Sequence, residues 1–173
     1  AQFSNIKLSS NKRNKIIRLF DMTLTIIINR RSTDYVLIDT YSGLAFIYTF
    51  TCSILCRIIG LNYLPILRGG DLPKMLFRKK AISKAIFSNS KNNIAPSFYI
   101  KSKFDQIGIK SIYIPNSIDI NRYTYKIRQN CRPKLLWVRS FHRVYNPIMA
   151  IKVFSKIKDE MPSAQLCMVG PDK

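Results

Sequence analysis

Three loops of this chain carry polar side chains directly after short apolar runs. They are Arg68-Gly69-Gly70-Asp71, residues 114–119 with Asn116 near their middle, and residues 139–143. In a parallel sheet the ligand lies beyond the carboxyl ends of the strands, so the loops that follow strands are where chemistry is expected. We therefore expect the binding residues in these three loops.

Two of the loops suit a phosphate or a sugar hydroxyl. Gly69 and Gly70 let the backbone approach a ligand closely and offer unobstructed N–H groups, and a tight turn that needs positive φ is the alternative explanation. Arg139 can pair with a diphosphate through its planar guanidinium, and Ser140 can donate a hydrogen bond. A surface arginine without a ligand is the alternative for Arg139.

Nucleophilic and metal chemistry find little support in the sequence. His142 is the only histidine and no nucleophile elbow is present, so we expect an ordinary loop histidine and assign no catalytic residue. Cys52, Cys56, Cys131 and Cys167 form no Cys-x-x-Cys pair. We therefore expect no metal site, and buried free thiols in a reducing compartment.

Short apolar runs alternate with longer segments of helical periodicity. Strands are expected at residues 35–39, 63–67, 93–95, 111–114, 134–138 and 165–169, and helices at 11–30, 44–59, from Pro73, from Phe98 (capped by Ser97) to about Gly108, and at 147–160. Strands this short, joined by helices, describe right-handed βαβ units and a parallel sheet. The predicted fold class is α/β.

The stretch from Asn121 to Pro133 is polar and basic, without a periodic apolar face, and is predicted to be a linker between domains. Residues 1–120 then form part of one α/β domain, and residues 134–173 begin a second. In the second domain the helix at 147–160 is expected to turn these apolar residues towards its sheet: Ile148, Ile151, Val153, Phe154 and Ile157.

The helical segment 11–30 has an apolar stripe with three- and four-residue steps. Its members are Ile16, Ile17, Phe20, Leu24, Ile27 and Ile28. Lys12, Arg13, Lys15 and Arg18 crowd the first turns, where the helix dipole disfavours cations and an anionic surface would offset the repulsion. A helix packed on the protein core is the first interpretation, and a helix lying on a membrane surface is the second.

The chain carries 29 basic and nine acidic residues, a net charge of +20. Such a charge attracts nucleic acid, anionic lipid or a phosphorylated substrate, although A+T-rich coding would produce the same bias. The basic residues are dispersed, which favours an anionic membrane surface over a nucleic-acid groove, and nucleic acid is not expected as a partner. A non-enzymatic nucleic-acid-, membrane- or partner-binding protein is the alternative to an enzyme.

Four segments resemble the family-4 glycosyltransferases in order and spacing. They are Ser97–Phe104, Ile112–Asp119, Leu135–Phe141 and Pro162–Pro171. In that family a Pro-Asn-Gly-Val-Asp loop closes the first domain and a Val-Gly-Arg-Leu loop opens the second. A Pro-Ala-x-Leu-x-Ile-Val-Gly strand comes soon after. The resemblance extends from about Tyr35 to the end of the sequence.

The resemblance implies Rossmann-like parallel sheets with flanking helices, of the GT-B type and here incomplete, lacking the first strands. It implies transfer of a sugar from a nucleotide-diphosphate sugar to a glycan or lipid-linked acceptor, without a cofactor or metal. The implied donor-binding residues are Arg139, Ser140, Phe141 and Tyr145, and the implied acceptor or cleft residues are Arg68, Gly69, Gly70 and Asn116. The implied location is cytoplasmic, peripheral on the inner face of the membrane, in cell-envelope polysaccharide synthesis.

The chain departs from the family pattern at several of these positions. Arg139 stands where the family has glycine, Ser140 where it has arginine, and Tyr145 near its donor-phosphate lysine. Arg68 replaces the usual histidine of the cleft loop. The family's Glu-x7-Glu pair is absent, since the only glutamate is Glu160. We therefore expect this polypeptide by itself not to turn over a sugar donor.

Overall fold

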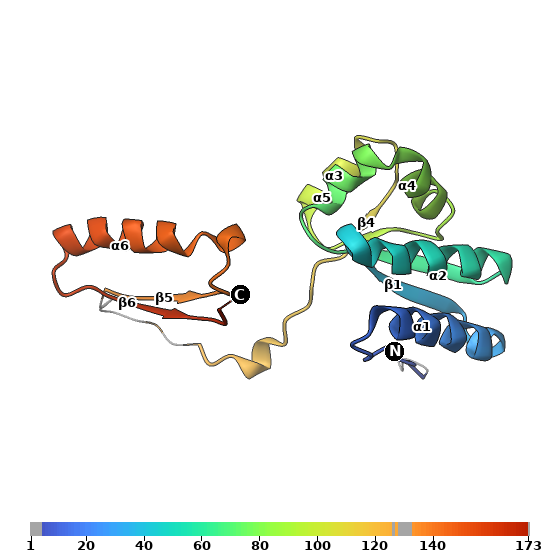
Figure 1. Cartoon of the computed structure of the whole chain (residues 1–173), viewed down its shortest axis with the longest axis horizontal. Helices are drawn as coiled ribbons and strands as arrows, with labels where there is room; N and C mark the ends of the chain where they lie inside the picture. The colour runs from blue at the N-terminus through green and yellow to red at the C-terminus, as the bar shows by residue number, and fades with distance from the viewer. Residues whose placement is uncertain (1–4, 126, 128–132, 173) are drawn as a thin grey trace. The chain divides into compact units, whose positions relative to one another are not determined.

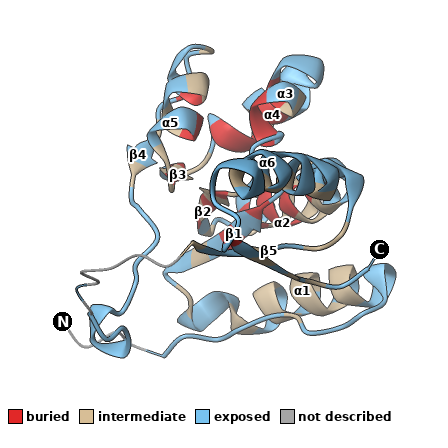
Figure 2. Cartoon of the chain, turned by 90° about the vertical axis from the view of Figure 1, so that its left-hand side faces the viewer, coloured by how far each residue is buried: buried red, intermediate tan, exposed pale blue. Residues whose placement is uncertain are grey.

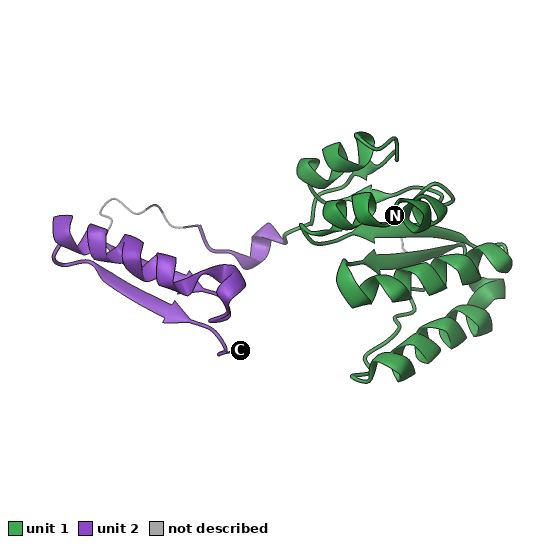
Figure 3. Cartoon of the chain, turned by 45° about the horizontal axis from the view of Figure 1, so that its top comes forward, with its two compact units in different colours: residues 1–118 green, residues 119–173 purple. Residues whose placement is uncertain are grey.

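The computed structural model describes residues 5–125, 127 and 133–172. The chain divides into two compact units, Ala1–Ile118 (unit 1) and Asp119–Lys173 (unit 2), shown in Figure 3. Unit 1 has a four-stranded parallel sheet of order β1-β2-β3-β4, and unit 2 has a two-stranded parallel sheet, β5-β6 (Figure 1). The predicted α/β class with parallel sheets and flanking helices is confirmed, and unit 1 is compatible with a Rossmann-like fold.

Every expected helix and strand is present, with shifts of a few residues at the ends. The strands are β1 Tyr35–Thr40, β2 Asn62–Leu67, β3 Ile94–Ala95, β4 Ile112–Tyr113, β5 Lys134–Val138 and β6 Gln165–Val169. The helices are α1 Lys15–Asn29, α2 Phe46–Ile58, α3 Leu72–Arg78, α4 Lys80–Phe87, α5 Phe98–Asp105 and α6 Pro147–Glu160, with 3-10 turns η1 Arg30–Ser32, η2 Gly43–Ala45, η3 Ile120–Arg122 and η4 Arg143–Tyr145. The helix expected from Pro73 is divided into α3 and α4 by Lys79, whose backbone leaves the helical region.

Side-chain caps fix where three of the helices begin. The Ser97 hydroxyl accepts a hydrogen bond from the Ile100 amide, as predicted. The Asn14 side chain accepts from two amides of the first turn of α1, which starts that helix at Lys15 and not at residue 11. Asn146 caps α6 in the same way by accepting from the Met149 amide. Each bond satisfies a backbone N–H that the helix cannot pair itself.

The core of unit 1 lies on one face of its sheet. Alternate residues of β1 and β2 point to that face, including Ile38, Tyr63 and Leu67, and helices α2 to α5 cover them. Figure 2 shows the buried residues gathered between these helices and the sheet. The rings of Phe87 and Phe104 meet edge to face at 5.1 Å. Each fully buried side chain of this size contributes about 1.5–3 kcal/mol to the stability of the unit.

The expectation that helix α1 packs its apolar stripe on the core is wrong. All six stripe residues are exposed, from 40% at Ile27 to 70% at Phe20. The neighbouring positions Met22 and Ile26 contact the core instead. The helix packs beside α2, so its contact face lies to one side of the stripe.

The prediction of which α6 residues face the sheet is also partly wrong. Phe154 and Ile157 line the space between α6 and the sheet, as expected, with Val153 half-exposed beside them. Ile148 and Ile151 are 64% and 54% exposed, so their predicted inward position is wrong. The sheet of unit 2 has two strands in the described residues, and Ile148 and Ile151 of the helix remain uncovered.

The boundary between the units falls slightly before the predicted linker at 121–133. Unit 2 begins at Asp119, whose carboxylate accepts from the Asn121 amide and pairs with Arg122 at 3.2 Å. The start of the predicted linker is therefore the short turn η3. Residues 126 and 128–132 of the predicted linker lie outside the described residues. Among the helices of the described ranges, none has the length and apolar character that crossing a bilayer requires.

The cysteines differ from one another in burial. Cys52 and Cys56, one turn apart on α2, are 1% and 0% exposed, as expected for buried thiols. Burial, the larger cause, raises the pKa of Cys52 to about 12 and that of Cys56 to about 11. The expectation of burial is wrong for Cys167, which is exposed because it points away from the helix-covered face of β6. Cys131 lies outside the described residues.

Ionisation of the two buried thiols is predicted to destabilise the fold at alkaline pH. The unfolded thiols ionise near the ordinary pKa of 9.0, so the unfolded state loses protons before the folded state does. The free energy of unfolding therefore falls as the pH rises from 9 towards the folded-state pKa values, by up to about 1.4 kcal/mol per pH unit for each thiol. Urea denaturation at several pH values measures this slope.

The matched control is the Cys52→Ala, Cys56→Ala double variant, which keeps every other alkaline group. We expect its stability to decline less steeply above pH 9 than that of the native chain. Identical slopes for the two proteins would contradict the assignment of the alkaline transition to these thiols.

Candidate functional site

The parallel register of β1 and β2 fixes the first predicted loop. The two strands pair along their whole length, with Asp39 opposite Ile66 and Thr40 opposite Leu67. The Arg68 amide then donates to the Thr40 carbonyl at 2.8 Å, so the ladder continues one residue beyond the strand. Arg68 is thereby held at the carboxyl edge of the sheet, where ligands of such sheets bind.

The Arg68 guanidinium joins the ends of three strands. Its Nε donates to Asp39 Oδ1 at 2.7 Å, and its Nη1 lies 3.4 Å from Asn116 Oδ1, 48 positions along the chain. Both partners are at strand ends: Asp39 is near the end of β1, and Asn116 follows β4. The structure therefore brings together two of the predicted residues, Arg68 and Asn116.

Asp39 is the member of this cluster that the sequence analysis did not predict. Its hydrogen bond to the guanidinium, followed by a favourable charge interaction, raises the pKa of Arg68 above its ordinary value. Its side chain is 53% exposed and that of Arg68 is 34% exposed, so both can reach a ligand. The sequence did contain a signal for Asp39. It is a carboxylate one residue before the end of a strand, at the same edge of the sheet as Arg68.

The two glycines of this loop serve different purposes. Gly69 has φ +91°, a backbone conformation that a side chain would strain, so the tight-turn explanation holds for Gly69. Its carbonyl accepts from the Leu72 amide at 3.3 Å and leads the chain into α3. Gly70 has an ordinary φ, and nothing lies within 4 Å of where its Cβ would be. Gly70 is exposed, so its backbone is open to solvent.

The third predicted loop follows β5 in unit 2. The Arg139 amide donates to the Val169 carbonyl at 3.0 Å, which again extends a parallel ladder beyond its last paired residues. The guanidinium carbon lies 5.5 Å from the centre of the Tyr145 ring, a cation–π contact. The Phe141 ring lies 5.3 Å from Trp137. Arg139, Phe141 and Tyr145 are therefore neighbours around the end of β5.

Ser140 does not have the geometry expected of it. Its hydroxyl donates to the Pro171 carbonyl at 3.1 Å, and the Phe141 amide donates to the same oxygen at 2.9 Å. The proton of the hydroxyl is thus used inside the protein, and it ties the β5 loop to the segment after β6. Its role as a hydrogen-bond donor to phosphate finds no support here.

Gly170 lets these two segments approach each other. A Cβ at this position would stand 1.6 Å from the Arg139 carbonyl oxygen, closer than any real contact. Only glycine therefore permits the extended β5–β6 pairing that holds Arg139 in place.

His142 and Asn146 shape the turn into α6. His142 Nδ1 accepts from the Val144 amide at 3.2 Å, which caps η4 and agrees with the expectation of an ordinary loop histidine. Asn146 adopts φ +49° and caps α6. Together they bring Tyr145 back over Arg139.

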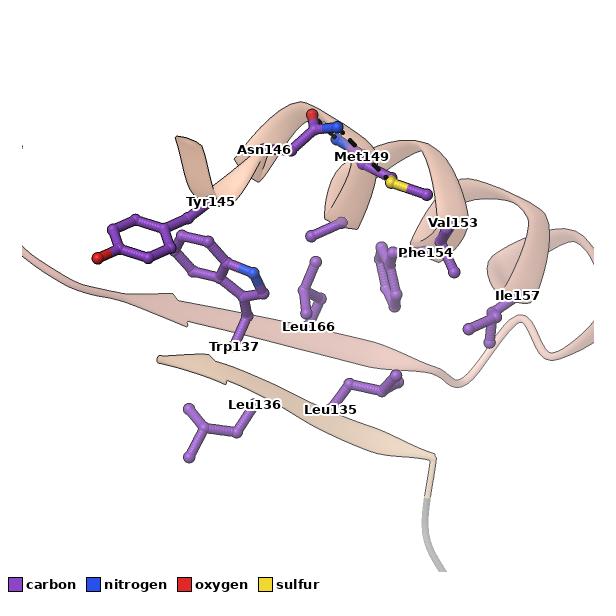
Figure 4. A pocket seen from close by; sticks show the side chains of 11 residues that line it. Leu135, Leu136, Trp137, Tyr145, Asn146, Met149, Val153, Phe154, Ile157 and Leu166 are labelled. Atoms are coloured by element: carbon purple, nitrogen blue, oxygen red, sulfur yellow. Dashed lines mark hydrogen bonds between the residues drawn. The ribbon is translucent and has the colours of Figure 1, made fainter. Parts of the chain in front are cut away.

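A cavity of about 370 Å³ lies under α6 in unit 2. Its lining is almost wholly apolar, and Figure 4 shows the rings of Trp137 and Tyr145 side by side at one end of it, with Asn146 above them. Phe154 and Ile157 line the rest, between helix and sheet. The cavity is open to solvent, since its lining residues Leu136 and Met149 are 68% and 59% exposed, and Arg139 does not line it.

The site residues are suited to oxygen-rich ligands. Arg68 offers guanidinium N–H groups, Asp39 offers carboxylate oxygens, and Asn116 offers an amide, a mixture that matches sugar hydroxyls, which both donate and accept. Arg139 offers a planar cation that matches a phosphate. Within residues 5–125, 127 and 133–172, no group of three or more His, Cys, Asp or Glu side chains lies close enough to hold a metal ion.

Comparison with known protein-family models and with curated proteins finds no match to this chain. By its fold the chain is an α/β protein with Rossmann-like parallel topology. Two loop clusters lie at the carboxyl edges of its sheets: Arg68 with Asp39 and Asn116, and Arg139 with Phe141 and Tyr145.

The pair formed by Arg68 and Asp39 is predicted to add little to stability. Both side chains are partly exposed, so solvent screens their attraction. In a double-mutant cycle with Asp39→Ala and Arg68→Ala, the coupling free energy of unfolding is expected to be below about 1 kcal/mol. Urea denaturation of the four proteins measures it.

The similarly exposed pair Lys101–Asp105 on α5 is the matched control, and we expect a coupling of the same size there. A coupling of several kcal/mol between Arg68 and Asp39 alone would make the pair structural and would argue against a binding role.

Proposed function

We propose that this chain is part of a GT-B-type glycosyltransferase that transfers a sugar from a nucleotide-diphosphate donor to a glycan or lipid-linked acceptor. In this proposal unit 1 binds the acceptor through Arg68, Asp39 and Asn116. Unit 2 binds the donor through Arg139, with Phe141 and Tyr145 beside it. The resemblance to the family-4 glycosyltransferases supplies the reaction, and the chemistry of the two loop clusters supports it.

The observation that carries the proposal is the contact between Arg68 and Asn116. The resemblance assigns both residues to the acceptor cleft from two motifs far apart in sequence, and their side chains lie 3.4 Å apart. Their loops follow β2 and β4 of one parallel sheet, so both residues lie at its carboxyl edge, and their side chains meet there. Asp39 orients the guanidinium from the other side, so the cluster is organised before a ligand arrives.

The donor side is supported by the chemistry of Arg139. Sugar transfer leaves a nucleoside diphosphate on which negative charge grows as the glycosidic bond breaks, and a cation placed there stabilises the transition state. Arg139 stands one position before the family's arginine, and its guanidinium is exposed and stacked on Tyr145. The Arg139 guanidinium thus supplies the positive charge that is lost where Ser140 replaces the family's arginine.

Nucleoside diphosphates are predicted to bind near Trp137 and change its fluorescence. Trp137 is the only tryptophan of the chain and lies beside Phe141, so its emission reports on this loop. Titration of the whole chain with uridine or guanosine diphosphate is expected to give a saturable change. Arg139→Ala is expected to weaken the binding roughly tenfold, because a charge-assisted hydrogen bond is lost.

Arg122→Ala is the matched control, since Arg122 is in unit 2 but pairs with Asp119 away from this loop. Its affinity should equal that of the native chain. An equal loss in both variants would mean that the net charge of +20 attracts the diphosphate without a site, which would contradict the proposal. Tight binding of RNA, with a steep dependence on salt, would favour the nucleic-acid alternative.

A further inference from the structure

Helix α1 packs on unit 1 through Met22 and Ile26, yet it turns most of its large apolar residues outward. Six of the seven exposed residues along the helix are large and apolar: Ile16, Ile17, Phe20, Leu24, Ile27 and Ile28. The less exposed side is mixed, with Leu19, Met22 and Ile26 beside the polar residues Arg18, Asp21, Thr23, Thr25 and Asn29. A helix on the surface of a protein in water normally turns its polar side outward. The outward face of α1, defined by the six apolar residues, therefore requires something to cover it.

Polar groups of α1 bond within the helix and do not interrupt this face. The hydroxyls of Thr23 and Thr25 donate to the carbonyls of Leu19 and Asp21, one turn back. The Asn29 amide donates to the Thr25 carbonyl at 2.8 Å. None of these side chains reaches out to water across the apolar stripe.

The segment before the helix enlarges the apolar face. Lys7 Nζ donates to Asn29 Oδ1 near the end of α1, and Arg18 Nε donates to the Lys12 carbonyl near its start. These two bonds hold residues 7–12 alongside the helix. Ile6 and Leu8 of this segment are 72% and 92% exposed.

Positive charge with little compensating negative charge surrounds the same face. Residues 5–31 contain seven of the chain's 29 basic residues: Lys7, Lys12, Arg13, Lys15, Arg18, Arg30 and Arg31. The only acid among them is Asp21, which lies on the less exposed side of the helix. The cations stand mainly at the two ends of α1. A helix with an apolar face bordered by Lys and Arg is the type that lies in the interface of an anionic bilayer.

We propose that the outward face of α1 docks on an anionic lipid bilayer, with the helix axis parallel to the membrane. The apolar residues enter the headgroup boundary, and the flanking cations contact lipid phosphates. The seven cations against one acid in residues 5–31 argue against a second copy of the chain as the occupant, since two such faces would repel each other. A further polypeptide strand beside β1, where Leu37 is 58% exposed, is the other alternative. Such a strand would give no reason for the cations around α1.

This inference goes beyond the proposed function and does not depend on it. Sugar transfer could be wrong while the face still binds lipid, because the face is built from residues outside both loop clusters. The test below uses no nucleotide sugar, so its outcome does not bear on that function.

Vesicle sedimentation with the whole chain tests the docking. Vesicles of phosphatidylcholine containing about one third phosphatidylglycerol are expected to bind the chain, and pure phosphatidylcholine to bind it far less. Leu24→Asp together with Ile28→Asp is expected to weaken partitioning roughly tenfold or more, since two apolar anchors are lost. Tyr99→Asp on α5, also an exposed apolar helix position, is the control and should bind as the native chain does.

A second variant tests the charges without touching the apolar face. Replacing Lys12, Arg13 and Lys15 by Gln should weaken binding to anionic vesicles roughly tenfold or more and reduce its dependence on salt. Circular dichroism should show the same helix content for every variant.

Three results would overturn the proposal. One is equal vesicle binding by the native chain and the Leu24→Asp, Ile28→Asp variant. Another is a dimer in sedimentation analysis that this variant dissociates, which would make a second copy the occupant. The third is loss of helix content in the same variant without vesicles, which would mean that protein covers the face.

Discussion

The parallel pairing of β1 with β2 is the contact on which the geometry of unit 1 depends. Six consecutive residue pairs fix the register from Tyr35 with Asn62 to Thr40 with Leu67. Because the strands are parallel, their carboxyl ends lie at one edge, and the loop after β2 starts beside the end of β1. Arg68 can reach Asp39 only in this register, since a slip of one residue would turn the Asp39 side chain to the opposite face.

The same rule operates on a smaller scale in unit 2. Five residue pairs join β5 to β6, and two further backbone hydrogen bonds extend the pairing to Arg139 and Phe141. That extension requires glycine at position 170, because any side chain there would collide with the Arg139 carbonyl. The position of the cation in unit 2 thus depends on the absence of a side chain on the neighbouring strand.

The two units differ in how much core supports their loops. Unit 1 buries a continuous cluster from Ile38 to Ile109, and one of its buried polar residues, Asn93, donates to the carbonyls of Phe87 and Lys110. In the described part of unit 2, Ala164 is the one buried hydrophobic residue. The Asp39–Arg68–Asn116 cluster therefore rests on a well-packed sheet, whereas the Arg139 loop relies mainly on backbone hydrogen bonds and aromatic contacts.

The sequence by itself determined the order of the elements, the α/β class and the positions of the loops after strands. Apolar periodicity and cap residues such as Ser97 act over a few residues, and such local signals can be read without coordinates. The sequence also predicted Arg68, Asn116 and Arg139 as binding residues, because their chemistry follows from residue type and from the position of each in a loop after a strand. Tyr145 was predicted from the family resemblance.

Only the tertiary structure decided which side chains meet and which face of a helix is covered. Asp39 joined the site because strand register, a contact between distant segments, placed it beside Arg68. The stripe of α1 had the periodicity of a packing face, yet it is exposed because the helix lies beside α2 and uses a different side. Periodicity tells where the apolar residues of a helix lie, and neighbouring elements determine whether anything covers them.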